Sequence, residues 1–277
     1  ELFEQITKLE EYYPTRTELS ILKDAGGEIA EALGDRCAMV EYGSGSGLKT
    51  RLLLEALRDP SGYIPVEISQ TALEQSVQAL SEQFPRLLVE PVRADYTRTF
   101  RLPELATRSR RRAVFFPGST IGNFTPEQAV VFMSQMREHV GEGGAVVIGV
   151  DLKKDPAVLH AAYNDADGVT AEFNRNVLVR INSTLGANFD LKHMSHYAFY
   201  EPVHGRIEMH LVSLASQEVR IGDAHFVLEE GETILTEYSY KYTVRQFGAL
   251  AAKAGLERVK TWTDPEQLFS VHYLVAK

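Results

Sequence analysis

The sequence predicts an α/β protein, a Rossmann-like sheet carrying an inserted α+β subdomain. Three observations lead to this prediction. Between residues 37 and 150, short apolar runs alternate with segments whose apolar residues recur at helical spacing, which is typical of parallel strands joined by helices. The alternation stops after Val150 and resumes near Val244. The intervening segment is too long for a structureless loop within a compact domain.

The alternating region predicts five strands and three helices. The strands are expected at Ala38–Tyr42, Tyr63–Ile68, Leu87–Pro91, Ala113–Phe116 and Ala145–Val150, and the helices at Leu48–Arg58, Thr71–Phe84 and Pro126–His139. Nearly continuous apolar strands indicate a parallel sheet covered on both faces. Ligands of such sheets bind beyond the carboxyl ends of the strands.

The remaining residues predict a second subdomain and the closing strands of the sheet. Residues 153–200 have the pattern of helix and loop, and strands are expected at Arg206–Leu214 and Val219–Leu228. A helix at Val244–Ala254 and strands at Leu256–Trp262 and Ser270–Val275 follow. We therefore assign residues 17–152 and 242–277 to the sheet domain, and residues 1–16 and 153–241 to a substrate-binding subdomain.

Composition and charge restrict the class of ligand. The 277 residues carry a net charge of −9 and one short basic run, Arg108 to Arg112, whereas nucleic-acid binding needs clustered Lys and Arg. No apolar run approaches the ~20 residues that cross a bilayer. The single cysteine, Cys37, suits a reducing cytosol. We expect a cytoplasmic protein with a small-molecule partner and no nucleic acid or membrane; the oligomeric state stays open.

A glycine-rich loop and three acidic positions predict the cofactor. Glu41 precedes Gly43-Ser44-Gly45-Ser46-Gly47, Glu67 ends the second predicted strand, and Asp95-Tyr96 follows the third. Glycines admit a close ligand, but a tight turn needs no ligand and nicotinamide enzymes also use such loops. Carboxylates suit the cation, ribose and adenine amino group of S-adenosylmethionine, and Lys49 suits its methionyl carboxylate. Taken singly, Asp95 could be a turn residue and Lys49 a solvated one.

Six strings along the chain are distinctive. They are E-Y-Y-P-T-R-T-E at 11–18, E-Y-G-S-G-S-G-L-K-T-R at 41–51, G-S-T-I-G-N at 118–123, F-N-R-N-V-L at 173–178, R-I-E-M at 206–209 and L-T-E-Y-S at 235–239. Together they resemble the histidine Nα-methyltransferase family of ergothioneine biosynthesis. The resemblance implies a class I methyltransferase sheet and three methyl transfers from S-adenosylmethionine to the α-amino nitrogen of L-histidine, giving hercynine. A related branch methylates tryptophan-like amines, which is the alternative.

The resemblance also implies the site residues. Cofactor contacts fall on Gly43, Ser44, Gly45, Lys49, Glu67, Asp95 and Tyr96; the amine falls on the Gly118 backbone and Asn123, the carboxylate on Tyr12 and Tyr163, and the imidazole on Met209, Glu237 and Ser239. Glu67 replaces an expected aspartate, so its longer arm should meet the ribose with altered geometry. The family usually has a W-F-Y-D segment upstream of L-F-E-Q-I-T, which this sequence, starting at Glu1, does not include.

Physical reasoning about the residues agrees with these roles. Methyl transfer to an amine needs a neutral, aligned nitrogen and no covalent nucleophile, and Gly118 and Asn123 offer oxygens that could accept its N–H bonds. Asn123 could instead cap a helix, although Thr125 followed by Pro126 is the better cap. Glu237 and Ser239 point to one side of an extended segment and suit the two nitrogens of an imidazole better than the single N–H of an indole.

Several alternatives remain at this stage. Tyr13 could replace Tyr12 as the carboxylate contact, and the general base is unresolved between bulk solvent and a tyrosine with ordered water. His193 and His196 are three residues apart but have no third ligand at a suitable spacing, so we expect no metal. The competing classes are a nicotinamide-dependent oxidoreductase and a catalytically silent binding protein with the same fold.

Overall fold

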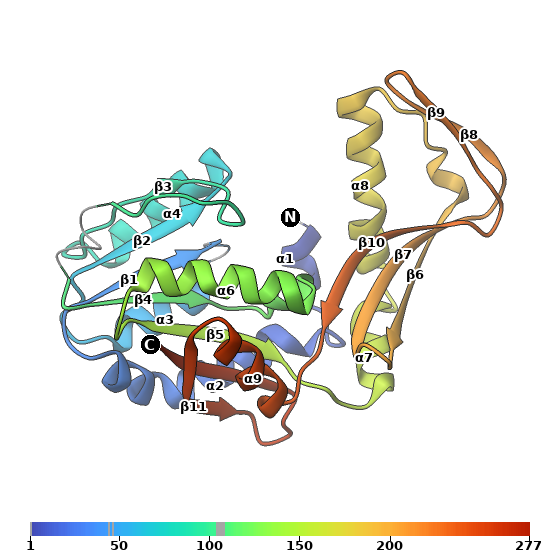
Figure 1. Cartoon of the computed structure of the whole chain (residues 1–277). Helices are drawn as coiled ribbons and strands as arrows, with labels where there is room; N and C mark the ends of the chain where they lie inside the picture. The colour runs from blue at the N-terminus through green and yellow to red at the C-terminus, as the bar shows by residue number, and fades with distance from the viewer. Residues whose placement is uncertain (1, 44, 46, 104–108) are drawn as a thin grey trace. The chain divides into compact units, whose positions relative to one another are not determined.

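The computed structural model describes residues 2–43, 45, 47–103 and 109–277. It divides into two compact units. One, here called the insert unit, comprises Glu1–Tyr13 and Lys153–Lys241; the other, the sheet unit, comprises Pro14–Leu152 and Tyr242–Lys277. The boundary expected between residues 16 and 17 falls inside helix α2 (Tyr13–Leu33). Figure 1 labels the helices and strands of both units.

The sheet unit is built on a seven-stranded mixed sheet. Its strands are β1 (Cys37–Tyr42), β2 (Gly62–Glu67), β3 (Val92–Arg93), β4 (Arg111–Phe116), β5 (Ala145–Asp151), β11 (Leu256–Thr263) and β12 (Phe269–Ala276). Their spatial order is β11-β12-β5-β4-β1-β2-β3. The five strands from β3 to β5 are parallel, whereas β12 runs antiparallel to both β5 and β11. The strand order reverses beside β1, where β2 and β4 flank it, and this switch point is where such sheets bind ligands.

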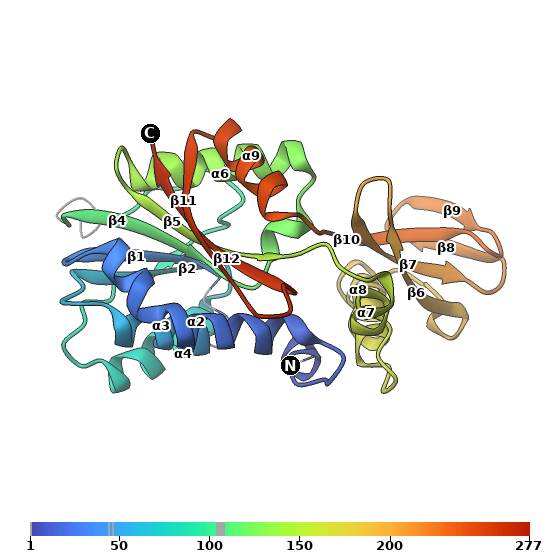
Figure 2. The same ribbon diagram turned by 90° about the horizontal axis from the view of Figure 1, so that it is seen from below.

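Helices cover both faces of this sheet. They are α2, α3 (Leu48–Ala56), α4 (Gln70–Gln83), α6 (Pro126–Val140) and α9 (Val244–Lys253). Figure 2 shows α2, α3 and α4 on one side of the sheet and α6 and α9 on the other. On the first side, Ile29, Leu53 and Leu80 join a single buried cluster with strand residues such as Met39 and Val147. This burial on both faces explains why the central strands are continuous apolar runs.

The third strand lies elsewhere than expected. The predicted strand Leu87–Pro91 is wrong: only Val89 forms an isolated bridge there, to Tyr63, and β3 follows at Val92–Arg93. Proline has no N–H to give to a sheet, so the ladder does not run through Pro91. The consequence for the site is small, because Asp95 still follows this edge strand.

The insert unit combines helices with two small sheets. Its elements are α1 (Leu2–Ile6), α7 (Pro156–Tyr163), α8 (Val169–Leu185), the short 3-10 helix η2 (Leu191–His193), β6 (Met194–Glu201), β7 (Arg206–Ser213), β8 (Gln217–Ile221), β9 (Ala224–Leu228) and β10 (Thr233–Tyr240). The first sheet has the order β10-β7-β6, and β8 pairs with β9. Two expectations are corrected here. Residues 153–200 contain a strand, β6, and the single strand Val219–Leu228 is a hairpin that turns at Gly222, whose φ is 57°.

The chain leaves the sheet unit and returns to it at adjacent points. Leu152, at the end of β5, and Tyr242, before α9, form a β-bridge. The Tyr242 N–H also donates to the Asp151 carbonyl at 3.2 Å. Residues 153–241 are therefore an insertion whose two ends are held together by the sheet unit itself.

Candidate active site

The ends of three parallel strands of the sheet unit, β1, β2 and β3, gather the predicted cofactor residues at one edge. After β1, Gly43, Gly45 and Gly47 all have positive φ, at 75°, 45° and 67°, a conformation that glycine adopts without strain. A Cβ at Gly43 would lie 3.4 Å from the Tyr96 ring, so the loop approaches Tyr96 closely. Ser44 lies outside the described residues.

Glu41 does not face a ligand, which corrects the reasoning from the sequence. Its side chain is buried, accepts from Thr50 Oγ1 at 2.7 Å, and accepts a short hydrogen bond from the Tyr63 hydroxyl. It therefore ties β1 to α3 and β2 beside the glycine loop. Burial raises the pKa of Glu41 to about 7, and these hydrogen bonds lower it only in part. The cofactor prediction then depends on Glu67, Asp95 and Lys49.

Replacing Glu41 with Gln is expected to alter the pH dependence of stability. The carboxyl pKa is raised from 4.5 in the unfolded chain to about 7 in the folded state. The free energy of unfolding of the wild type therefore falls as pH rises between these two values, by a term on the order of 3 kcal/mol. Glu41→Gln lacks this term and keeps partners for Thr50 and Tyr63. Urea unfolding from pH 5 to 8.5 measures the free energy of unfolding of both proteins. The free energy of the variant should rise relative to that of the wild type as pH rises. A pH-independent difference would contradict the prediction.

The carboxylates after β2 and β3 lie at the same edge. Glu67 Oε1 accepts from the backbone N–H of Ile68 and Ser69, at 2.9 and 3.1 Å. Asp95 Oδ1 accepts from Thr97 N and Oγ1, and these bonds lower the pKa of Asp95. Asp95 is therefore ionised near neutral pH, and local hydrogen bonds hold both side chains in place. The bonds to Thr97 also make Asp95 the turn residue considered above.

Aromatic rings line the same edge. The Tyr96 ring stacks on Tyr42 with a centroid separation of 5.8 Å and an interplanar angle of 11°. Phe116 and Phe132 pack edge-on or tilted against both rings at 5.9 to 6.3 Å. The His139 ring closes the cluster by a short contact between its Nδ1 and the Tyr42 hydroxyl. Tyr42, Phe116 and Phe132 are buried, whereas Tyr96 is half-buried, so the cluster packs the strand ends and presents only part of the Tyr96 ring.

A buried carboxylate that the sequence reasoning missed links two predicted site residues. Glu18 is 0% exposed, and its Oε2 accepts from Lys49 Nζ at 2.5 Å and from Gly118 N at 2.8 Å. A Cβ at Gly149 would lie 2.2 Å from Glu18 Oε1, so glycine leaves room for this carboxylate. Glu18 thus fixes the start of the G-S-T-I-G-N turn beside Lys49. Its place in the E-Y-Y-P-T-R-T-E string was the available signal.

The G-S-T-I-G-N turn leaves Asn123 available. Gly118 and Ser119 have φ of 87° and 60°, and Ser119 Oγ accepts from the Asp151 N–H at 2.8 Å. The short 3-10 helix η1 (Thr120–Asn123) then leads to α6, which Thr125 caps with a full capping box. The cap expected at Thr125 is confirmed, so Asn123 is not the capping residue. Its side chain is exposed.

In the insert unit, strand alternation places the predicted imidazole residues on one face. Glu237 pairs with Met209 and Ser239 pairs with Ile207, and Met209 and Ile207 are buried. We call this the inner face, against which α7 and α8 pack.

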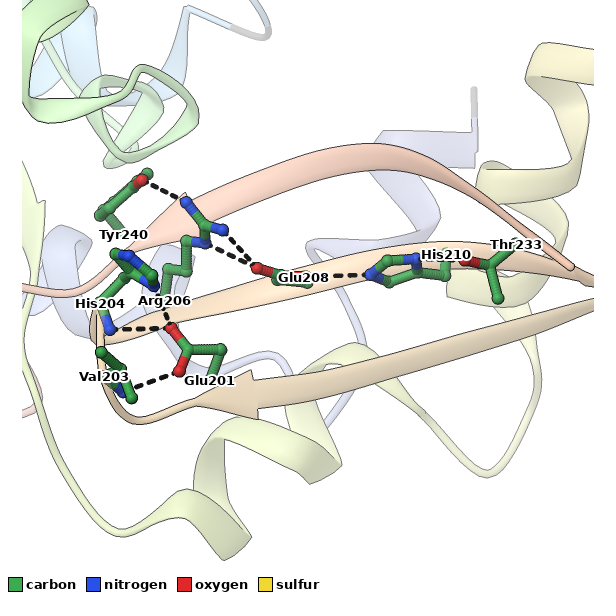
Figure 3. A network of polar contacts seen from close by, with 8 residues as sticks. All are labelled: Glu201, Val203, His204, Arg206, Glu208, His210, Thr233 and Tyr240. Carbon is green, nitrogen blue, oxygen red and sulfur yellow. Dashed lines mark hydrogen bonds and ion pairs between the residues drawn. The ribbon is translucent and has the colours of Figure 1, made fainter.

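The opposite, outer face carries a chain of polar contacts (Figure 3). Arg206 pairs with Glu208 at 2.5 Å and reaches the Tyr240 hydroxyl, and Glu208 contacts His210 Nε2 at 3.1 Å. The Arg206 guanidinium also lies 3.8 Å from the Tyr238 ring centroid. Because these contacts join β7 to β10, they hold the register that sets which residues of both strands face inward.

The inner face holds a buried polar group. The Tyr163 hydroxyl donates to Ser239 Oγ at 2.8 Å, and Lys241 Nζ donates to both oxygens, at 2.9 and 2.8 Å. Burial raises the pKa of Glu237 to about 7, which the nearby Lys241 charge partly offsets. Lys241, 1% exposed, is a second residue that sequence reasoning missed.

The N-terminal tyrosines of the insert unit differ in their surroundings. Tyr13 is buried, and its hydroxyl accepts from Lys154 Nζ at 2.6 Å. Tyr12 is half-buried, with its ring edge-on to Phe3 at 6.4 Å.

The F-N-R-N-V-L string has a structural role. Asn174 is buried in α8, donates to the His210 carbonyl at 3.1 Å, and contacts His196 Nδ1 at 3.0 Å and Thr236 Oγ1 at 2.6 Å. It thereby ties α8 to all three strands of the sheet. His196 also contacts the Tyr163 carbonyl through Nε2 at 2.8 Å, whereas His193 contacts Asp190.

Within the part of the chain that the structure describes, no group of three or more His, Cys, Asp and Glu side chains is placed to hold a metal ion. The helices among those same residues include none long and apolar enough to cross a membrane.

The sheet order, the glycine loop and the acidic edge define an S-adenosylmethionine-dependent methyltransferase of class I. The chemistry of these residues fits the cofactor, because the glycine loop admits a close ligand and the carboxylates of Glu67 and Asp95 end or follow neighbouring strands of the same sheet edge. An S-adenosylmethionine-dependent methyltransferase structure from Clostridium acetobutylicum superposes with a TM-score of 0.51 at 11% identity, over 93% of this chain and 91% of that one.

The family follows from sequence comparison. A family model described as histidine-specific methyltransferase, SAM-dependent, matches residues 1–276. The chain belongs to this family. It is 40% identical to the histidine N-alpha-methyltransferase of Mycolicibacterium smegmatis, over 99% of this chain and 86% of that protein. It is 30% identical to ergothioneine biosynthesis protein 1 of Neurospora crassa, over 99% of this chain and 31% of that protein.

Proposed function

We propose that this chain transfers three methyl groups from S-adenosylmethionine to the α-amino nitrogen of L-histidine, and that the product, hercynine, serves ergothioneine biosynthesis. Family membership and the 40% identical relative support the reaction. Glu237 and Ser239 lie on the inner face of one strand, next to Met209 of its neighbour. This placement supports histidine as the substrate, because a carboxylate and a hydroxyl suit the two nitrogens of an imidazole. An indole would leave one partner unpaired.

We propose a role for each site residue of the two units. In the sheet unit, Lys49, Glu67 and Asp95 bind the methyl donor, which supplies a methyl group bonded to a cationic sulfur. The Gly118 carbonyl and Asn123 Oδ1 accept N–H bonds from the neutral amine. These bonds aim its lone pair, and positioning of this kind supplies much of the rate in a bimolecular displacement. In the insert unit, Tyr12 and Tyr163 are proposed to hold the substrate carboxylate. Met209, Glu237 and Ser239 are proposed to hold the imidazole.

No covalent intermediate with the enzyme is needed in any of the three methyl transfers. The nitrogen lone pair forms the new N–C bond as the C–S bond breaks, and S-adenosylhomocysteine leaves. The first two products are ammonium ions that lose one proton each to solvent before the next transfer; the third is a quaternary ammonium and keeps its charge. We also place the reaction in the cytoplasm with no nucleic acid as partner, in keeping with the net charge of −9 and with the lone thiol, Cys37, which is buried with its pKa raised to about 12.

Mass spectrometry tests the function directly. The protein is incubated with S-adenosylmethionine and an equimolar mixture of the twenty amino acids, and mass gains are followed with time. We expect a gain of three methyl groups on histidine alone, with three S-adenosylhomocysteine molecules per product. Methylation of tryptophan instead of histidine, or binding of histidine without S-adenosylhomocysteine formation, would overturn the proposal in favour of the two rival functions.

A further inference from the structure

Lys241 lies just after β10 and is joined to two predicted site residues. Its Nζ donates to the Tyr163 hydroxyl at 2.9 Å and to Ser239 Oγ at 2.8 Å. The Tyr163 hydroxyl in turn donates to Ser239 Oγ at 2.8 Å. All three side chains are buried. The three groups therefore form a closed ring of hydrogen bonds on the inner face.

This ring fixes the direction of the Ser239 hydroxyl. A serine hydroxyl has two acceptor lone pairs and one proton. Tyr163 and Lys241 each direct a hydrogen to Ser239 Oγ, so both lone pairs are used. The remaining capacity of Ser239 is its own O–H, which can only donate. In this arrangement Tyr163 helps to orient Ser239.

The neighbouring carboxylate has the opposite polarity. Glu237 lies two residues before Ser239 on the same face of β10, and an ionised carboxylate only accepts hydrogen bonds. The same lysine favours this ionised form, since its charge opposes the effect of burial on the Glu237 pKa. Lys241 thus acts on both groups. It leaves the Ser239 hydroxyl as a donor and the Glu237 carboxylate as an acceptor, side by side on the inner face.

We propose that Lys241 is a positioning residue that makes Ser239 an obligatory donor, so that the inner face selects a neutral imidazole over other aromatic rings. One ring nitrogen accepts from Ser239, and the other donates its N–H to Glu237. This inference rests on the proposed function, because it concerns how histidine is chosen. The pair of groups excludes three related rings. A pyrrole or an indole has no ring nitrogen that can accept from Ser239, and an imidazolium has two N–H donors and no acceptor.

Two substitutions separate hydrogen bonding from packing. Lys241→Met keeps the length of the side chain and removes its donors, whereas Lys241→Gln keeps N–H donors without the charge. Calorimetry near pH 8 measures three ligands: L-histidine, 3-pyrrolylalanine, which has an N–H at the position of Nε2 and no acceptor, and 4-thiazolylalanine, which has an acceptor at the position of Nδ1 and no N–H. Ser239→Ala and the Ser239→Ala/Lys241→Met double variant complete the set.

The expected result is selective. Lys241→Met should weaken histidine and 4-thiazolylalanine by about tenfold, the effect of losing one buried hydrogen bond, and change 3-pyrrolylalanine by less than about twofold. Lys241→Gln should recover part of the loss. Ser239→Ala should give the same ligand pattern, and the double variant should add little to it, because both changes remove one interaction. Melting temperature and S-adenosylmethionine affinity report on folding in every variant.

Two outcomes would overturn the inference while the proposed function stands. One is a wild type that binds histidine while Lys241→Met keeps its preference for rings with an acceptor. The other is an equal loss for all three ligands. Should Lys241→Met fail to fold, Lys241→Gln and Ser239→Ala decide the matter, since a Ser239→Ala variant that still prefers histidine over 3-pyrrolylalanine also contradicts the inference. A wild type that does not bind histidine ends both proposals.

Discussion

Replacing Asn123 with Ala is expected to reduce turnover of histidine by about 100-fold, the usual effect of a misaligned reacting group, with S-adenosylmethionine affinity changed by less than about twofold. The reason is that Asn123 Oδ1 would hold the amine and not the methyl donor. Stability should change little, because Asn123 is exposed and Thr125 caps α6. Single-turnover kinetics measure the chemical step, and calorimetry measures the cofactor.

The substrate can be varied to sharpen this test. Neutral Nα,Nα-dimethylhistidine has no N–H left to donate, so Asn123→Ala should slow its methylation much less than the first methylation of histidine. Asn188→Ala is the control, because it removes an exposed carboxamide of the insert unit whose contacts are with Glu218 and Arg220. Equal losses of turnover and cofactor affinity, or equal losses on both substrates, would argue against amine contact.

Glu237→Leu should weaken histidine binding by about 10- to 100-fold, since a hydrogen bond to a charged group is lost. Phenylalanine, which has no ring N–H, should not be weakened. Glu218→Leu is the control, because Glu218 is an exposed carboxylate on β8. Calorimetry that finds unchanged histidine affinity for Glu237→Leu would remove Glu237 from the site.

The pKa of Glu237 gives the same residue a pH signature. Its raised value, about 7, means that the carboxyl becomes neutral as pH falls through 7 and no longer accepts fully from the ring N–H. Wild-type affinity for histidine should therefore fall between pH 8 and about 6.5. Because the imidazole of the ligand also protonates near pH 6.5, the contribution of the carboxyl is taken from the difference between wild type and variant. Glu237→Gln should bind more weakly at pH 8 but show a flatter profile over this window. Parallel profiles would contradict the assignment.

Most of the sheet unit could be predicted because its strands are buried on both faces. Runs such as Ala113–Phe116 and Ala145–Val150 contain almost nothing but apolar residues, and the structure confirms both strands. Strand β6 was missed because its burial pattern is irregular and its polar and aromatic residues, such as His196, make side-chain contacts that no local pattern encodes.

The site was predictable where a motif adjoins a strand end, and not where contacts are long-range. Gly43 follows β1, Glu67 ends β2, Asp95 comes shortly after β3, and Asn123 ends the turn after β4, so their edge of the sheet could be inferred. Glu18 reaches Gly118 from a helix 100 residues earlier in the chain, and Lys241 meets Tyr163 across 78 residues. Neither contact leaves a periodic signal, and Glu41 misled because its burial depends on Tyr63 of the neighbouring strand.

The bridge between Leu152 and Tyr242 has a consequence for how the protein is made. Strand β5 and its neighbour β12 are separated in the chain by all of residues 153–241. During synthesis, the whole insertion therefore leaves the ribosome before β11 and β12 can complete the sheet. An insertion whose ends meet adds little closure entropy, because that term grows only with the logarithm of length. The insertion therefore delays completion of the sheet during synthesis but costs the folded protein little stability.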